Sequence, residues 1–129
     1  NPMIPLGGHL YWDIAGLYNE VIKGLRKVAS EGISIDSIGI DTWGCDFAFF
    51  GSDGQLLGMP HCYRDQHTLG AQEKFFEKMP AEEVYKRTGI QFMDFNSLFQ
   101  LDTLKRNGSQ ALEHAPGCTY IYADRQDHL

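Results

Sequence analysis

The chain has 129 residues, of which 43% are hydrophobic, and its 17 acidic and 11 basic side chains give a formal net charge of −6. This length fits one domain, and the composition is too apolar for a disordered chain. The acidic balance argues against a nucleic-acid partner. No apolar run approaches the ~18 residues of a membrane span and no secretory leader is visible, so we expect no membrane partner.

The first elements are predicted over residues 1–32. Residues 1–12 are rich in proline and glycine and predict a loop that leads into an edge strand or a turn. Asp13 is a suitable helix cap, and apolar residues recur at helical spacing from Ile14 to Val28. The sequence therefore predicts an amphipathic helix that ends at Gly32.

Two strands are predicted next. The isoleucine-rich run 33–41 and the run 45–50 both have strand composition. Ser52-Asp53-Gly54 supplies turn residues, so we expect residues 55–58 to return as the second arm of a hairpin.

The second half of the chain predicts mainly helices, over residues 67–78, 80–88, 96–107 and 110–114. The second of these has Pro80 in its first turn and Gly89 directly after its last residue, which gives it clear bounds. A strand follows at 118–122, and Asp124 is suited to cap a further helix. Because helices and strands alternate, the fold class is α/β.

The cysteines give no sign of a disulfide framework. Cys45, Cys62 and Cys118 are odd in number and form no Cys-x-x-Cys pair, so a reducing, cytoplasmic setting is expected. A zinc site built from His61, Cys62, Cys45 and His67 lacks paired ligands at short spacing. We therefore prefer to interpret these residues as buried thiols and surface histidines, and predict no metal ligand.

Three polar clusters, at 41–46, 61–65 and 89–98, have residues suited to binding a polyol. Trp43 could stack on a sugar face, and Arg64 with Asp65 offers hydrogen-bond donors and acceptors. Each cluster also has a plain structural interpretation: a capped turn, a loop ion pair, and a helix cap with core aromatics. On the residues alone the structural interpretation is favoured, except at Phe95 and Asn96, where the two stand equal. No nucleotide-binding, serine-hydrolase or zinc-protease motif is present.

The same clusters carry a family resemblance. The runs 37–47, 63–65, 87–92 and 95–101 resemble the FGGY carbohydrate kinases, and within them the rhamnulokinase branch. The similarity extends in order from about Tyr11 to Leu129. It implies a partial actin-like ATPase domain, of the ribonuclease H-like type, with a mixed sheet and flanking helices.

The resemblance also implies a function: phosphorylation of L-rhamnulose at O1 by ATP with Mg²⁺, in rhamnose catabolism. Two alternatives stay open, namely a kinase for another deoxyketose such as L-fuculose, and a non-catalytic fragment that only binds a sugar or a partner chain. The positions that match the family's sugar-binding residues are Gly44, Cys45, Tyr63, Arg64, Asp65, Phe95 and Asn96.

Two parts of the family pattern have no match in this sequence: the Asp-x-Gly phosphate-binding strand and the general-base aspartate. We therefore expect residues 1–129 to be an incomplete N-terminal domain that binds no ATP, Mg²⁺ or other metal and is inactive alone. Its partners would be a ketose and the remainder of the kinase chain. Neither Asp41 nor Asp46 is assigned the role of base. A sheet cut from a larger domain exposes edges and apolar faces, so the isolated piece should be marginally stable or self-associate.

Overall fold

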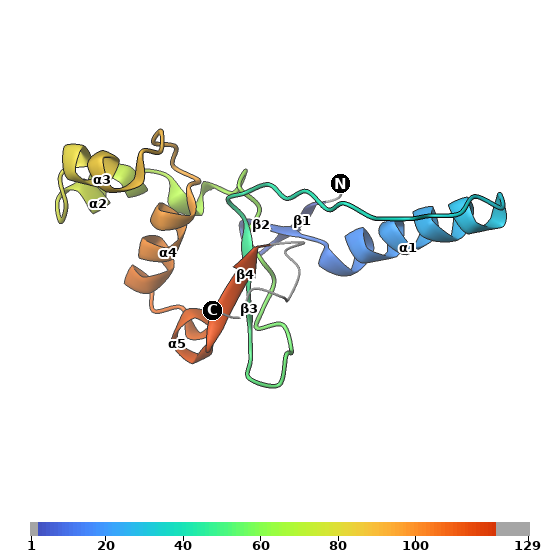
Figure 1. Ribbon diagram of the computed structural model, residues 1–129. Coiled ribbons are helices and arrows are strands. Elements are labelled where there is room, and N and C mark those ends of the chain that lie inside the picture. The colour runs from blue at the N-terminus through green and yellow to red at the C-terminus, as the bar shows by residue number, and fades with distance from the viewer. Residues whose placement is uncertain (1–2, 121–129) are drawn as a thin grey trace.

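The computed structural model describes residues 3–120, in which short strands and helices alternate (Figure 1). The elements in chain order are β1 (Met3–Leu6), β2 (His9–Trp12), α1 (Ile14–Ser30), β3 (Phe47–Phe50), the 3₁₀ helix η1 (Gln66–Thr68), α2 (Ala71–Phe76), α3 (Ala81–Thr88), α4 (Ser97–Arg106), α5 (Gln110–His114) and β4 (Gly117–Tyr120). No helix within residues 3–120 is long and apolar enough to cross a membrane.

The described strands form two antiparallel pairs. β1 pairs with β2 in the register Met3↔Trp12, and the two are joined by a Gly7-Gly8 turn. The N-terminal residues thus form both arms of a hairpin, where a loop was predicted for the first arm. β3 pairs with β4, with Phe47 opposite Tyr120.

The hairpin predicted between β3 and residues 55–58 forms only in part. The isolated bridge Phe50↔Leu56 and the 2.8 Å bond from the Leu57 amide to the Phe49 carbonyl are what remains of the return arm. β4, from the far end of the described chain, forms the four-residue ladder with β3 instead. A longer-range partner has replaced the local one.

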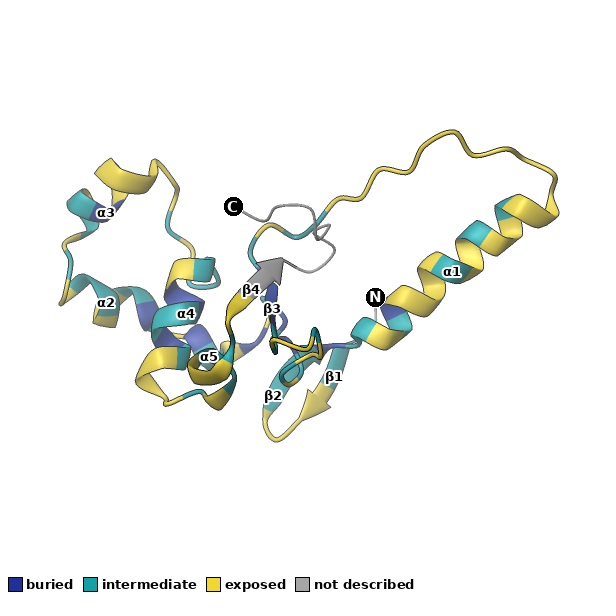
Figure 2. Ribbon diagram, turned by 60° about the horizontal axis from the view of Figure 1, so that its bottom comes forward, coloured by how far each residue is buried: buried dark blue, intermediate teal, exposed yellow. Residues whose placement is uncertain are grey.

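The strand predicted at residues 33–41 is wrong. This segment has no regular structure, and all of its residues are exposed, with Ile38 and Ile40 at 61% and 64% (Figure 2). A strand forms only where a neighbour accepts and donates its backbone hydrogen bonds. No strand among residues 3–120 pairs with this segment. Its isoleucine content is therefore not enough to make it a strand.

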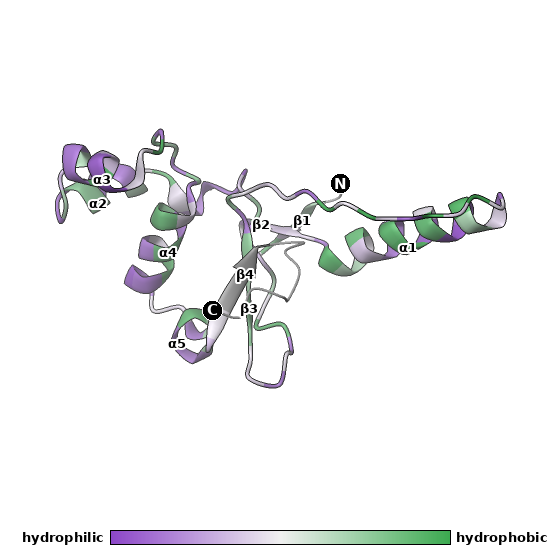
Figure 3. Cartoon of the chain, viewed as in Figure 1, coloured by the Kyte–Doolittle hydropathy of each residue, from purple (hydrophilic) through white to green (hydrophobic). Residues whose placement is uncertain are grey.

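Helix α1 forms as predicted but buries little of its apolar face. The Asp13 side chain accepts a hydrogen bond from the Gly16 amide at 2.8 Å and caps the helix. Leu17 is its buried residue, whereas Tyr18 is 63% exposed. The helix extends away from the other elements, and hydrophobic residues recur along it (Figures 1 and 3).

The later helices follow the prediction closely, with one break. The helix predicted at 67–78 divides into η1 and α2 because Leu69 takes an extended conformation between them. α3 begins directly after Pro80 and ends at Gly89, whose φ of +65° is the left-handed conformation expected of a C-terminal glycine. α4 and α5 lie where they were predicted.

Two small apolar clusters form part of the core of the described residues. In the first, Trp12, Leu17 and Cys62 are buried together, and partly buried side chains pack around them. In the second, Phe99 of α4 is buried, and the rings of Phe75, Phe76 and Phe92 meet it edge to face. The predicted polar clusters contribute to both, since Cys62 belongs to the first and Phe92 to the second.

Candidate sugar-binding site

Asp46 links three separate parts of the chain. Its side chain is 1% exposed, and its Oδ2 accepts hydrogen bonds from Trp12 Nε1 at 2.5 Å and from the Tyr63 amide at 2.9 Å. Its Oδ1 accepts a bond from Gln100 Nε2 at 3.3 Å. The carboxylate therefore joins β2, the 61–65 loop and α4, and both of its oxygens are occupied.

Gln100 is the residue that fixes the start of α4. Its buried amide donates to the Cys45 carbonyl at 3.0 Å and to the Phe95 carbonyl at 2.8 Å. Ser97 Oγ adds a 2.9 Å bond to the same Cys45 carbonyl. This role of Gln100 was not predicted from the sequence. The one indication was that Gln100 is a polar residue within the apolar face of the helix predicted at 96–107.

Aromatic side chains from three predicted clusters meet beside this network. Trp43 stacks on Trp12, with ring centroids 4.3 Å apart and planes at 25°. Tyr63 meets Phe95 edge to face at 5.6 Å, and its ring lies 6.3 Å from that of Trp12. The structure therefore brings Tyr63 and Phe95 together, as their assignment to one site requires.

Three other predicted residues, Gly44, Cys45 and Asn96, line a single hollow of about 280 Å³. The rest of its lining comes from α3, the following loop and α4: Val84, Thr88, Ile90, Phe92, Ser97, Leu98 and Phe99. Gly44 has a φ of +68°, and a Cβ there would meet no atom within 4 Å. Its conformation, and not a lack of space, requires glycine.

The hollow contains neutral polar groups. Burial, together with the neighbouring Asp46 carboxylate, raises the pKa of the Cys45 thiol to about 12, so the thiol stays protonated. Asn96 Nδ2 donates to the Gln91 carbonyl at 2.8 Å, which leaves its side-chain oxygen to accept a hydrogen bond. Such groups suit an uncharged, hydroxyl-bearing ligand.

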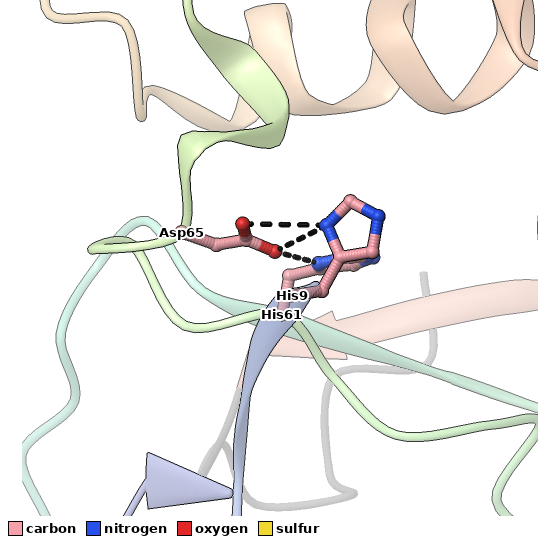
Figure 4. Close-up of side chains that lie close together, drawn as sticks. All are labelled: His9, His61 and Asp65. Carbon is pink, nitrogen blue, oxygen red and sulfur yellow. Dashed lines mark hydrogen bonds and ion pairs between the residues drawn. The ribbon is translucent and has the colours of Figure 1, made fainter. Parts of the chain in front are cut away.

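The remaining two predicted residues are placed differently. Arg64 is exposed, and its Nε donates to the Tyr63 hydroxyl at 3.0 Å with the guanidinium 5.4 Å above that ring. Asp65 is buried and faces His9 and His61 (Figure 4). Arg64 thus holds Tyr63, and Asp65 belongs to a histidine cluster outside the hollow's lining.

The side chains of the hollow offer no ligand for Mg²⁺. This ion needs carboxylate oxygens. The side chains that line this hollow are apolar, hydroxyl, thiol or amide, and none is charged.

Comparison with known proteins identifies the family. The model described as "FGGY family of carbohydrate kinases, N-terminal domain" matches residues 2–124. The chain belongs to the FGGY family of carbohydrate kinases. This FGGY chain is 60% identical over 115 residues to a rhamnulokinase of Bacteroides thetaiotaomicron, which covers 89% of the chain and 24% of that relative. It is 41% identical over 104 residues to a rhamnulokinase of Mannheimia succiniciproducens, covering 81% of the chain and 22% of the relative.

Solved structures of sugar kinases share the fold. A gluconate kinase from Lactobacillus acidophilus matches with a TM-score of 0.73, and a ligand-bound xylulose kinase from the same organism with 0.77. Each is 18% identical in sequence, and each match covers 93% of this chain and 25% of the solved one. The predicted fold class is therefore confirmed, and the chain spans about a quarter of the length of these relatives.

Proposed function

We propose that this chain is part of a rhamnulokinase, which transfers the γ-phosphoryl group of ATP to O1 of L-rhamnulose. The observation that carries the proposal is the 60% identity to a rhamnulokinase over 89% of the chain. The setting we propose is rhamnose catabolism in the cytoplasm.

Within that enzyme, these residues bind and orient the ketose. Gly44, Cys45 and Asn96 face the hollow, and the Tyr63–Phe95 pair stands beside the Asp46 network that fixes it. Sugars present both hydroxyl groups and apolar faces, so neutral polar groups beside aromatic rings are suited to them. Holding the hydroxyl in a fixed position is the main contribution a protein makes to phosphoryl transfer.

Proton transfer is assigned to the remainder of the kinase chain, which also holds ATP and Mg²⁺. Asp46 is the buried carboxylate nearest to the hollow in sequence, but Trp12, Tyr63 and Gln100 occupy its oxygens. A general base must reach the proton it accepts. We therefore keep Asp46 as a positioning residue, which holds the parts of the site together.

Steady-state turnover of a ketose panel tests the proposal. The full-length protein, supplied with ATP and Mg²⁺, should have its highest kcat/KM on L-rhamnulose, with L-fuculose, xylulose and gluconate well below. A preference for L-fuculose would leave a deoxyketose kinase with another substrate. A folded full-length protein that phosphorylates none of these would contradict the proposal.

One matched pair of variants tests the site itself. Asn96→Ala removes the amide that faces the hollow, whereas Asn107→Ala removes an exposed amide at the other end of α4. Loss of one hydrogen bond to a hydroxyl is worth about 1 kcal/mol, so Asn96→Ala should raise KM for the ketose roughly 5-fold. Asn107→Ala should leave KM unchanged. Equal effects of the two changes would exclude Asn96 from the site.

A further inference from the structure

Two histidines, His9 and His61, lie beside one buried carboxylate, that of Asp65, next to the candidate site (Figure 4). A third histidine, His67, lies near the same carboxylate. His9 Nδ1 lies 3.0 Å from Asp65 Oδ2, and His61 Nδ1 lies 2.7 Å from the same oxygen. His67 Nδ1 is 3.5 Å from it. Three ring nitrogens from two distant parts of the chain thus converge on a single oxygen atom.

The fold fixes this arrangement through its backbone. His9 begins β2, and the isolated bridge Tyr11↔His61 places the 61–65 loop beside that strand. Asp65 caps η1 by accepting a bond from the His67 amide at 3.2 Å, which orients its carboxylate toward the rings. The cluster is therefore held by β-bridging on one side and by a helix cap on the other.

The His67 ring is buried but makes no hydrogen bond, and its polar contact is the 3.5 Å approach to Asp65. The His67 side chain is 5% exposed, and neither ring nitrogen makes a hydrogen bond, although the ring stacks on His61 with centroids 4.1 Å apart. Burial of an unsatisfied polar group costs about 1–3 kcal/mol. Such a group next to an anionic oxygen and two further imidazoles is typical of a site that accepts a cation.

We propose that His9, His61 and Asp65 bind a divalent metal ion of the zinc class. One ligand atom from each of the three lies within 4.8 Å of the others. In a tetrahedral zinc site with bonds of about 2.0–2.1 Å, ligand atoms lie about 3.3 Å apart. Because an ionised carboxylate only accepts hydrogen bonds, the Nδ1 atoms of His9 and His61 each carry the hydrogen of their bond to Asp65. Metal binding therefore needs each ring to carry its proton on Nε2 instead, and the 3.0 and 2.7 Å N···O distances to open to about 3.3 Å.

This site goes beyond the proposed kinase reaction and is distinct from the Mg²⁺ that accompanies ATP. A set of imidazole nitrogens and one carboxylate favours zinc over Mg²⁺, which prefers oxygen ligands. The ion would join β2 to the loop that carries Tyr63, two residues from Asp65 in the chain. Its role is structural: it would hold Tyr63 in place beside the sugar hollow. No metal ligand was predicted from the sequence, because His61, Cys62, Cys45 and His67 are not paired at short spacing.

The test uses the full-length protein, freed of metal by a chelator and titrated with Co²⁺. One equivalent should produce the visible absorption of a four-coordinate site, and Zn²⁺ should displace it. His9→Ala is the key variant because this side chain is 43% exposed and its loss should not prevent folding. His9→Ala and Asp65→Asn, tested as two single variants, should each weaken Co²⁺ binding by at least about tenfold. His114→Ala, an exposed histidine on α5, is the matched control and should bind as the wild type does.

Absence of the Co²⁺ spectrum in the wild type would overturn the proposal, as would a His9→Ala variant that binds with unchanged affinity. Asp65→Asn could lose its fold, and in that event His9→Ala and His61→Ala decide the result. The readout is a metal-binding spectrum, so it does not depend on kinase activity. A protein that binds no metal here yet phosphorylates L-rhamnulose would contradict only this inference.

Discussion

Two regions of the molecule contain many apolar residues but differ in burial. The region around Asp46 and α4 is mostly buried or half-buried, whereas the region from α1 to residue 41 is largely exposed. In the first, Phe99, Asp46 and Gln100 are 1–2% exposed because several elements meet there. In the second, Val21 and Ile38 are 47% and 61% exposed (Figures 2 and 3). Periodicity and composition determine whether a helix can form, but burial depends on which neighbours are present.

The largest effect on the free energy of unfolding is expected at Phe99, in the buried region. Phe99→Ala removes the ring that Phe75, Phe76 and Phe92 surround, and truncation of a buried phenylalanine costs about 3–5 kcal/mol. Leu98→Ala, at the more exposed neighbouring position, should cost under about 1 kcal/mol. Denaturant unfolding of the full-length protein measures both. Equal losses would show that α4 is not anchored through Phe99.

Asp46 gives the next largest effect. In Asp46→Asn the side-chain oxygen can still accept from Trp12 and the Tyr63 amide only if its NH₂ group faces the Gln100 amide. One donor therefore loses its acceptor, at a cost of about 1–3 kcal/mol in the free energy of unfolding. Asp41→Asn is the control because Asp41 is exposed. An Asp46→Asn protein of unchanged stability and abolished turnover would instead support a catalytic role for this acid.

The exposed region gives a smaller effect of a different kind. A peptide of residues 1–129 should self-associate through the apolar faces of α1 and residues 33–41, since large exposed apolar patches promote association. Val21→Asp should weaken that association about tenfold, as seen by sedimentation velocity, whereas Lys23→Asp should not. A monomeric wild-type peptide would contradict this account of α1.

A pH effect on α4 is the smallest we expect. Burial raises the pKa of Asp102, but hydrogen bonds from Lys78 at 2.8 Å and Arg106 at 2.7 Å outweigh it and hold the pKa below its ordinary value. A pKa lowered in the folded state gives stability that is present above the unfolded pKa of about 3.9 and is lost as pH falls through the folded pKa.

Thermal unfolding between pH 6 and pH 3 measures this contribution, which should stay under about 1 kcal/mol because Lys78 is exposed. The Asp102→Asn protein should show less loss of stability over that range than the wild type. The same acid sensitivity in both proteins would assign the effect to other carboxylates.

Local sequence signals predicted the elements that depend on local contacts. α3 has Pro80 and Gly89 at its ends, and the bounds found match those predicted. The segment 33–41 failed because a strand needs a partner, and the partner of β3 was mistaken because β4 lies far along the chain. Sequence alone could not show which of several possible neighbours each strand would meet.

The site was predictable to a similar extent. Gly44, Cys45 and Asn96 line one hollow, as residues of one sugar site should. Asp65 matches the family pattern in the chain, yet its side chain turns toward His9 and His61. Gln100 was missed because its contacts, to Cys45 and Asp46, are visible only once α4 has packed against the segment before β3.

Hydrogen–deuterium exchange of the full-length protein, with and without L-rhamnulose, tests the central claim most directly. The proposed site predicts slower exchange in peptides that contain residues 43–46, 63 and 95–97, with no change in α1 or at 33–41. L-Fuculose at the same concentration should protect these peptides less. Unchanged exchange at all three segments with L-rhamnulose, or protection confined to α1, would contradict the account.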